Sequence, residues 1–434
     1  MNLQGKKMLL MGGGAYANDI ERYKKEMGFE CVALGRDAGT PIARISEKFY
    51  QIDTQNVEAV AEVVLKESID GIFVGSSEIN ISPAIDVSAM TGTHFYVNRE
   101  QWDVLANKAR FKEVCRKYGV PVVPEFALKP DYTTEDVAAL NFPVMIKPTD
   151  SSGAHGMNAC YCAEDFDVLY QEALKWSKKK EVIVEELITE ADEVFFQYTL
   201  QDGECSLTSC FTKVFVKTEN KSLILPIFHM YPSKYIEEYF ASVHAAVQKM
   251  FKGIGVDSGV MTLQSFYKNG QFYIFEAGFR MGGAQNYILT DYQWGINSLE
   301  CMINYALTGS MLDKRIADID NARFRYPCCN YYVGLKSGVI AKMGGVEEVK
   351  KMAGVLNVTV MSKEGEEVMD TNSLDRICLR IHVVGSTPDE LAHTLVEISD
   401  TLQIVSTEGE DMQLEHLTYE RCLKAIGDAT SFEV

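Results

Sequence analysis

Residues 142–157 read Phe142-Pro143-Val144-Met145-Ile146-Lys147-Pro148-Thr149-Asp150-Ser151-Ser152-Gly153-Ala154-His155-Gly156-Met157. They place Lys147 at the end of an apolar strand, directly before a glycine-bearing loop of small residues. Backbone N–H groups in such a loop can close around phosphate oxygens, while the lysine adds a positive charge. Glycine and serine also mark most surface connections, so the loop alone fits an ordinary turn equally well. The stretch therefore predicts a strand followed by a candidate nucleotide phosphate site, which other parts of the chain must support.

The whole chain has the composition of a globular protein. It has 434 residues, of which 47% are apolar, enough for about three domains and a substantial core. No apolar run approaches the ~20 residues that span a bilayer, so we expect a cytoplasmic protein that does not bind membranes. The net charge of -19 opposes binding to nucleic acid, so any polyanion that the chain binds is expected to be small, as ATP is. Eleven cysteines without a repeated CxxC spacing indicate reduced thiols.

The first 105 residues alternate strand and helix patterns, which predicts a parallel α/β domain. Gly12-Gly13-Gly14 follows the first strand like a dinucleotide-binding loop, but Ala17 stands where GxGxxG requires its last glycine. Because that glycine is missing, a NAD-dependent dehydrogenase ranks only third among the candidate functions of this chain. Glu78 and Asn80 come after a buried strand, at the sheet edge where open α/β folds bind ligands.

A helix is predicted to begin after Asn107, as its N-cap, and to end at Gly119. Its apolar positions recur at i, i+3, i+4 and i+7, namely Phe111, Val114, Cys115 and Tyr118. Lys108 lies in the first turn, where the helix dipole disfavours a cation. We therefore expect Lys108 either to reach out to water or to face an anion.

Two strand-like runs predict a β-hairpin, Ser258–Tyr267 and Gln271–Phe279, around Lys268-Asn269-Gly270. The length of the turn decides whether Gln264 and Glu276 share a face of the sheet. A two-residue turn would pair Tyr267 with Phe272 and place Glu276 on the opposite face. A three-residue loop would pair Tyr267 with Gln271 and make Glu276 a same-face neighbour of Gln264.

We predict the three-residue loop, because Gly270 at its last position suits a left-handed backbone. Gln264 and Glu276 would then lie roughly 7 Å apart, close enough to share a cation. One carboxylate and one amide oxygen suit magnesium, with manganese as an alternative, and ATP phosphates and water would complete its coordination. Arg280 follows on the same face and can hold phosphate or carboxylate through two hydrogen bonds.

Taken together, these motifs resemble the ATP-grasp superfamily in both order and spacing. The elements that carry the resemblance are Lys108, Phe142–Lys147, the Ser151-Ser152-Gly153 loop, Val184–Ile188, Gln264, Glu276 and Arg280. The chain looks like a carboxylate-amine ligase of the L-amino-acid ligase type, and is also similar to biotin carboxylase and carbamoyl-phosphate synthetase. The resemblance implies an ATP-grasp architecture of mixed α/β and α+β class. It places a parallel-sheet domain at 1–105, a two-subdomain ATP-grasp core at 106–326 with a lid at about 120–187, and an α+β domain at 327–434.

The resemblance also implies a role for each matching residue. Glu186 and Ile188 would offer backbone groups to adenine, Glu193 would contact the ribose, and Arg280 and Lys147 would act in catalysis. Magnesium would be bound by Gln264 and Glu276. The full set of nucleotide contacts implied in this way is Lys108, Lys147, Ser151, Ser152, Gly153, His155, Gly156, Glu185, Glu186, Ile188, Glu193 and His229.

Three positions depart from the family pattern. Gln264 is a neutral metal ligand where an acid is usual, as in carbamoyl-phosphate synthetases. Gly278 stands where the family usually has an asparagine ligand, which puts a second magnesium ion in doubt because glycine has no side chain. His155 occupies a loop position where arginine or lysine is common, and we expect a histidine to be a weaker phosphate clamp than either.

The activity implied by the resemblance is ATP-dependent joining of a small carboxylate to an amine through an acyl phosphate, with release of ADP and phosphate. Gly278 and His155 motivate an alternative, a nucleotide-binding protein with weakened or lost catalysis. Carboxyl or carbamoyl phosphate chemistry is a further alternative. Gln285 and Asn286 are candidate contacts for the accepting substrate. A homodimer is the default expectation for the assembly.

Overall fold

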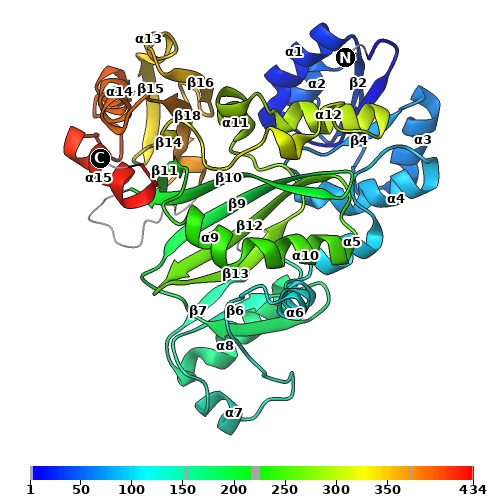
Figure 1. The fold of residues 1–434 in the computed structure, drawn as a ribbon, viewed down its shortest axis with the longest axis vertical. Coiled ribbons are helices and arrows are strands. Elements are labelled where there is room, and N and C mark those ends of the chain that lie inside the picture. The colour runs from blue at the N-terminus through cyan, green and yellow to red at the C-terminus, as the bar shows by residue number, and fades with distance from the viewer. Residues whose placement is uncertain (1–2, 152–154, 217–224, 372–373, 433) are drawn as a thin grey trace.

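The computed structural model describes residues 3–151, 155–216, 225–371, 374–432 and 434. A large central sheet joins three lobes, with the lid on one side and the N- and C-terminal lobes on the other (Figure 1). This mixture of one parallel sheet and several antiparallel ones confirms the predicted fold class. None of the helices in the described part of the chain is both long and apolar enough to cross a membrane.

The N-terminal lobe is a four-stranded parallel sheet with strand order β3-β2-β1-β4. Its helices and strands are β1 (Lys7–Leu10), α1 (Ala17–Met27), β2 (Glu30–Gly35), α2 (Pro41–Ile45), β3 (Lys48–Gln51), α3 (Val57–Glu67), β4 (Gly71–Phe73) and α4 (Ile81–Thr91). A short 3-10 turn, Glu78–Asn80, follows β4 at the carboxyl edge of the sheet. The position of this turn is the one that ligands use in open α/β sheets.

Two helices connect this lobe to the rest of the molecule, α5 (Arg99–Leu105) and α6 (Lys108–Tyr118). The bounds predicted for α6 are confirmed. Asn107 Oδ1 accepts a hydrogen bond from the backbone N–H of Arg110 at 3.0 Å, and Gly119 ends the helix with a left-handed φ of 75°. The cap therefore places Lys108 at the first position of the helix.

The lid is a small antiparallel sheet with strand order β5-β8-β6-β7. Its elements are β5 (Glu125–Phe126), α7 (Thr134–Ala138), β6 (Val144–Pro148), β7 (Asn158–Cys160), α8 (Ala163–Trp176) and β8 (Val182–Glu186). A separate apolar core, which includes Ile146, Phe166 and Tyr170, holds α8 against the sheet. Because this core is independent of the main one, the lid is a compact unit of its own.

The central sheet has eight strands in the order β13-β12-β9-β10-β11-β14-β18-β16. The elements of its first part are β9 (Asp192–Gln201), β10 (Glu204–Phe215), β11 (Pro226–Tyr231), α9 (Ile236–Ser242), α10 (His244–Ile254), β12 (Gly259–Lys268), β13 (Gln271–Gly278), α11 (Tyr287–Trp294) and α12 (Ser298–Thr308). Helices α9 and α10 cover one face, where Phe196 and Leu263 pack against Val247 and Phe251 in the main core (Figure 1). Side chains alternate along a strand, so Gln264 lies on the opposite face.

The C-terminal segment continues the central sheet through β14, β18 and β16. Its elements are β14 (Cys328–Gly334), β15 (Gly338–Gly344), α13 (Val346–Val349), β16 (Val355–Val360), β17 (Glu367–Val368), β18 (Ile377–Val384), α14 (Pro388–Thr401), β19 (Gln403–Ser406) and α15 (Tyr419–Ala429). We expected a separate α+β domain here. The segment does have its own apolar core, but β14 pairs directly with β11, so no break in the sheet separates it from the core region.

The predicted three-residue loop of the hairpin is wrong. Lys268 pairs with Gln271, so the turn consists of Asn269 and Gly270, whose φ values of 52° and 79° are both left-handed. Asn-Gly favours this two-residue type I′ turn because its twist matches that of the flanking strands. A β-bulge, which hydrophobic periodicity does not reveal, then corrects the register. As a result Gln264 lies directly opposite Glu276, on the same face.

Candidate active site

Glu276 and Gln264 form a carboxylate–amide pair on the face that α9 and α10 leave uncovered. Gln264 Nε2 donates a hydrogen bond to Glu276 Oε2 at 3.1 Å. A Cβ added at neighbouring Gly278 would meet no atom within 4 Å, so open space lies beside the carboxylate. Among the residues that the structure describes, no group of three or more His, Cys, Asp or Glu side chains could hold a metal. Magnesium fits the pair because it accepts few protein ligands and takes the others from water and phosphate.

Lys108 faces an anion, as one of its two predicted arrangements requires. Its Nζ lies 3.4 Å from Glu276 Oε1 and donates a hydrogen bond to the carbonyl of Ser151 at 2.7 Å. The backbone N–H of Lys108 also donates to the carbonyl of Thr149 at 2.9 Å. The first turn of α6 therefore ties the loop that follows Lys147 to the carboxylate–amide pair.

Lys147 is nearly buried at the end of β6 and forms an ion pair inside the lid. Its Nζ lies 2.6 Å from Glu185 Oε2 on β8 and 5.6 Å from the ring centre of Phe275. Glu185 also accepts a hydrogen bond from Lys112 of α6. We did not predict a role for Lys112 from the sequence. A lysine beside Phe111 on the apolar side of an amphipathic helix is the signal that could have indicated one.

The lid loop is partly outside the described residues, since Ser152 and Gly153 are not among them. At its near end the hydroxyl of Ser151 donates to the carbonyl of His155 at 3.0 Å. The imidazole of His155 stacks on Trp176 with ring centres 4.9 Å apart. A Cβ at Gly156 would lie 2.7 Å from Trp176 Cβ, and φ there is 73°, so both space and backbone require glycine. His155 and Gly156 therefore seat the loop against α8.

The predicted adenine contacts lie at the end of β8. Glu186 uses its backbone N–H within the lid, donating to the carbonyl of Pro124 at 3.0 Å. Ile188 follows two residues later, in the connection between β8 and β9. Both residues therefore lie at the junction between the lid and the central sheet, where the resemblance expects the adenine.

Glu193 and His229 lie on the same face of the sheet as Gln264, in a neighbouring row two residues away along the strands. Glu193 forms a 2.8 Å ion pair with Lys213. His229 is three strands across and two residues along from Gln264, roughly 16 Å at the usual strand spacing and rise per residue. Its Nδ1 shares a hydrogen bond with the hydroxyl of Tyr332 at 3.1 Å. Burial holds the pKa of His229 well below its ordinary value, so the ring is neutral.

Arg280 connects the central sheet to the N-terminal lobe. Its NH2 and Nε groups lie 3.2 and 3.3 Å from Glu78 Oε2. Glu78 lines a cleft of about 520 Å³ between the N-terminal lobe, α5 and the lid, whose apolar walls include Ile79, Trp102 and Trp176. The same carboxylate also borders a small pocket beside Lys108 and Glu276. The cleft therefore leads from the lid loop to the carboxylate–amide pair.

Asn80, another candidate contact, is used within the N-terminal lobe. Its Oδ1 accepts a hydrogen bond from the hydroxyl of Thr54 at 2.7 Å, and its Nδ2 donates to the hydroxyl of Ser77 at 3.0 Å. The side chain is also buried. The structure thus places Glu78 in the cleft and Asn80 beneath it.

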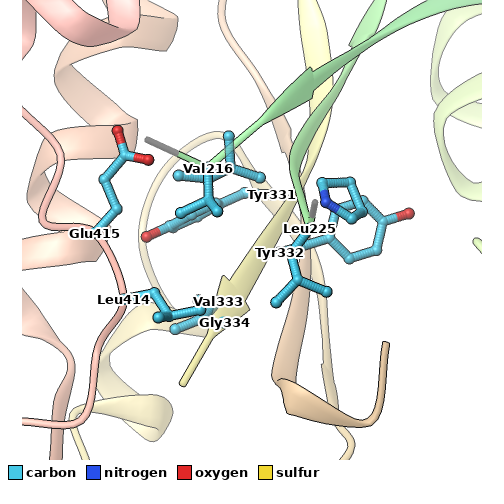
Figure 2. A pocket seen from close by; sticks show the side chains of 10 residues that line it. Val216, Leu225, Tyr331, Tyr332, Val333, Gly334, Leu414 and Glu415 are labelled. Atoms are coloured by element: carbon cyan, nitrogen blue, oxygen red, sulfur yellow. The ribbon is translucent and has the colours of Figure 1, made fainter. Parts of the chain in front are cut away.

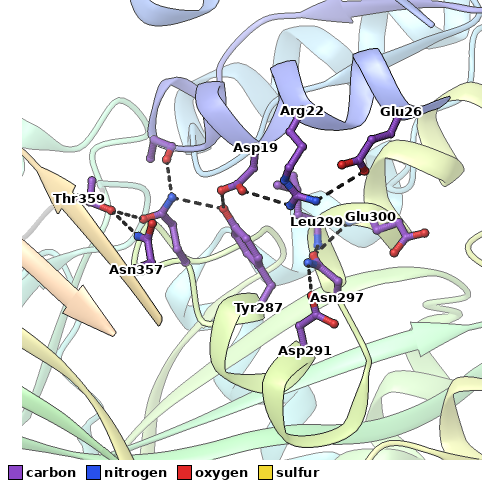
Figure 3. Close-up of polar contacts among 12 residues, drawn as sticks. Asp19, Arg22, Glu26, Tyr287, Asp291, Asn297, Leu299, Glu300, Asn357 and Thr359 are labelled. Atoms are coloured by element: carbon purple, nitrogen blue, oxygen red, sulfur yellow. Dashed lines mark hydrogen bonds and ion pairs between the residues drawn. The ribbon is translucent and has the colours of Figure 1, made fainter. Parts of the chain in front are cut away.

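Gln285 lies where the three segments of the chain meet. Its Nε2 donates to the carbonyl of Ala15 at 2.8 Å and to the hydroxyl of Tyr287 at 3.2 Å, and its Oε1 accepts from Thr359 at 2.8 Å. Figure 3 shows the hydroxyl of Tyr287 pointing to the carboxylate of Asp19 on α1, to which it donates a hydrogen bond at 2.7 Å. The amide of Gln285 is therefore fully used inside the protein. Its neighbour Asn286 likewise bonds to Gln197 and Asn330.

A layer of buried polar side chains on β18 supports residues 280–286. Arg380 donates to the carbonyl of Gly283 and to Gln285 Oε1, and His382 Nε2 shares a hydrogen bond with the carbonyl of Ala284 at 3.1 Å. Burial, with Arg380 nearby, lowers the pKa of His382 to about 3, so the ring is neutral. We did not predict a role for Arg380 or His382 from the sequence, although a charged residue inside an otherwise apolar strand is a signal that could have indicated one.

A further pocket between β11, β14 and the segment before α15 is too small for a substrate. It is lined by Val216, Leu225, Tyr331 and Leu414, among others (Figure 2). Its volume of about 10 Å³ has room for roughly one water molecule. The cleft at Glu78 is therefore the better candidate for a substrate site.

Residues 107–313 match the family model described as carbamoyl-phosphate synthase L chain, ATP binding domain. Formate-dependent phosphoribosylglycinamide formyltransferase of Saccharolobus solfataricus is 27% identical over 258 residues, which cover 57% of this chain and 61% of that relative. The match thus spans less than two thirds of the relative's length.

Two solved structures share the fold over nearly the whole chain. The biotin carboxylase domain dimer of Hydrogenobacter thermophilus 2-oxoglutarate carboxylase, in complex with MgADP, ADP and bicarbonate, has a TM-score of 0.76 at 18% identity. That match covers 98% of this chain and 94% of that one. L-amino acid ligase from Bacillus licheniformis has a TM-score of 0.74 at 17% identity and covers 93% and 99%. Residues 107–313 therefore match a family of ATP-binding domains, and the chain as a whole shares its fold with these two enzymes.

Proposed function

We propose that this chain is an ATP-dependent, ADP-forming ligase that joins a small carboxylate to an amine through an acyl phosphate. The observation that supports it most directly is the small pocket that Lys108 and Glu276 share with Glu78, where Glu276 is bonded to Gln264 and Glu78 forms an ion pair with Arg280. Two cations beside a carboxylate–amide pair match what phosphoryl transfer needs, because the reaction is catalysed mainly by positioning and by charge stabilisation.

The nucleotide would lie between the lid and the central sheet. Lys108 and Lys147 would offset the charge of its phosphates, and the loop from Ser151 to Gly156 would cover them. Magnesium bound by Glu276 and Gln264 would neutralise further phosphate charge. Rotation of the Gln264 amide by half a turn would present its oxygen in place of the nitrogen that now faces Glu276.

In the first step an oxygen of the substrate carboxylate would attack the γ-phosphorus. The bond between that phosphorus and the β–γ bridging oxygen breaks, and ADP leaves with the electron pair. Arg280 would hold the carboxylate in place through its planar guanidinium group, exchanging its present contact with Glu78 for the substrate. The ion pair thus keeps the arginine oriented until the acid arrives.

In the second step the amine nitrogen would attack the acyl carbon, and phosphate would leave. Glu78, released from Arg280, can attract an ammonium group and accept the proton that the nitrogen loses. Ile79, Trp102 and Trp176 line the same cleft, so an amine with an apolar or aromatic side chain fits it best. Closure of the lid would exclude water, which otherwise hydrolyses the acyl phosphate.

The test is a panel of carboxylic acids and amines, amino-acid pairs above all, read by release of ADP and phosphate. Release that requires both an acid and an amine supports the ligase. Release with bicarbonate alone would point to carboxyl phosphate chemistry. Tight MgATP binding without turnover across the panel would contradict the ligase and favour a nucleotide-binding protein that has lost catalysis.

A further inference from the structure

Three charged side chains meet in a buried cluster between α6 and the lid sheet, and the proposed mechanism uses one of them. Lys112, Glu185 and Lys147 have side chains that are only 0, 1 and 6% exposed. Glu185 Oε2 lies 2.6 Å from Lys147 Nζ, while Glu185 Oε1 accepts a hydrogen bond from Lys112 Nζ. Lys112 also donates to the carbonyl of Val123 at 3.1 Å. The single carboxylate therefore joins two lysines.

The charges of this cluster do not cancel. A buried pair of Lys147 and Glu185 alone would be neutral, and separating it would leave an uncompensated carboxylate in a poorly solvated place, which is costly. Lys112 changes this balance, because Glu185 keeps a partner when Lys147 moves. Burial lowers the pKa of Lys112 to about 8, so its ammonium is still protonated at pH 7.

Lys112 cannot contact the nucleotide itself. Its side chain is fully enclosed between α6 and the lid sheet, and its neighbours there are Glu185, Glu125 at 3.6 Å and the backbone. Glu125 has its own cationic partner in Arg116, one turn further along α6. Any influence of Lys112 on ATP must therefore pass through Glu185 to Lys147.

We propose that Lys112 is a positioning residue for nucleotide binding: it holds the charge of Glu185, so that Lys147 can turn from that carboxylate to the phosphates of ATP. This inference rests on the proposed function, since it takes Lys147 as a phosphate contact. It adds a residue to the site that never touches the substrate.

The experiment measures equilibrium binding of magnesium with β,γ-imido-ATP to the full-length protein by calorimetry, together with ATP KM and kcat. We expect Lys112→Met to weaken binding and to raise KM about tenfold, the scale of a weakened charge-assisted contact, with kcat at saturating ATP within about twofold. Adding Glu185→Gln to that variant should restore binding, because a neutral amide no longer retains Lys147. Lys112→Arg should keep near-normal binding.

Arg116→Met is the matched control, since it removes another cation of α6 from an ion pair that does not include Glu185. Its ATP KM should not change. Unchanged binding in Lys112→Met, or equal weakening in the double variant, would overturn the inference. If Lys112→Met does not fold, Glu185→Gln alone decides the matter: binding at least as tight as wild type supports it, and weaker binding overturns it. Failure of the wild-type protein to bind the nucleotide would instead overturn the proposed function.

Discussion

Two lysines with the same predicted role occupy different surroundings. Lys108 faces Glu276 and the lid loop beside the open cleft, whereas Lys147 is paired with Glu185 inside the lid. A cation at the start of a helix is disfavoured unless an anion is near, and Glu276 supplies one. At the scale of single residues, then, the neighbours decide what each lysine can do.

Replacing Lys147 with alanine should remove a charge that stabilises the transferring phosphoryl group. We expect kcat/KM for ATP to fall roughly 100-fold, which corresponds to a loss of about 3 kcal/mol of transition-state stabilisation. The measurement is steady-state ADP release, with Lys252→Ala as the control because that lysine is exposed on α10. Unchanged turnover in Lys147→Ala would remove the residue from the catalytic set.

Gly278→Asn should be tolerated and should strengthen metal binding. A Cβ there meets no atom within 4 Å, and φ is not in the left-handed range, so neither space nor backbone opposes a side chain. An added amide oxygen beside Glu276 should lower the magnesium concentration for half-maximal activity by about fivefold, the effect of roughly 1 kcal/mol. An unchanged magnesium requirement would mean that position 278 does not face the metal.

The neutral His382 should make stability depend on pH. Its pKa is about 3 in the folded chain and about 6.5 when unfolded, so between these values only the unfolded chain takes up the proton. The free energy of unfolding should therefore fall as pH drops below 6.5, by about 2 kcal/mol from pH 6.5 to 5 for this group. Urea unfolding at both pH values should show a smaller loss for His382→Gln, which can still donate to Ala284. Equal losses would contradict the assignment.

At the scale of elements, the residues that begin and end α6 and one β-bulge in the hairpin place the side chains of the candidate site. Asn107 and Gly119 define α6 and thereby place Lys108. The hairpin brings Gln264 opposite Glu276, the two proposed magnesium ligands, through a turn and a bulge whose effects on register compensate. A bulge re-aims one side chain at the cost of one unpaired residue, which is why bulges often lie beside functional sites.

Asn107→Ala should loosen the start of α6 and disturb Lys108. Losing the cap typically costs about 1 kcal/mol of stability, and we expect ATP KM to rise with it. Asn98→Ala is the matched control, because Asn98 caps α5 through an equivalent bond to Gln101. Thermal unfolding should show similar losses for both variants, and kinetics should show a higher KM only for Asn107→Ala. A rise in both would assign the effect to general destabilisation.

At the scale of the whole molecule, the loop after β13 is held by all three segments of the chain. Gln285 bonds to Ala15, Tyr287, Thr359 and Arg380, and its φ of 54° is unusual for a residue other than glycine. Such strain persists only where the surrounding structure imposes it. Arg280 begins this loop, so the contacts between lobes also position the arginine that we propose to act in catalysis.

Gln285→Ala should therefore affect stability and catalysis together. Leaving the buried partners of the amide unsatisfied costs about 1–3 kcal/mol, and the freed loop should misplace Arg280 and lower kcat. Calorimetric unfolding and ADP release measure the two effects. Gln248→Ala, which removes a single hydrogen bond from α10 to the carbonyl of Cys205, is the control and should leave kcat unchanged.

The homodimer expected from the sequence is also a property of the whole molecule. Light scattering of the purified protein would measure it.

Local signals in the sequence were enough for α6, for the strand that carries Lys147 and for the order of motifs that resembles ATP-grasp proteins. Caps and periodicity act within one or two turns of chain, so they can be read without knowing the fold. The partners of Lys147 could not be read in this way, since Glu185 and Lys112 approach it only when β8 and α6 pack together. The same holds for Arg380 and Gln285, whose bonds join segments about 100 residues apart. Pairing over such distances depends on the whole core, and only the tertiary structure decides it.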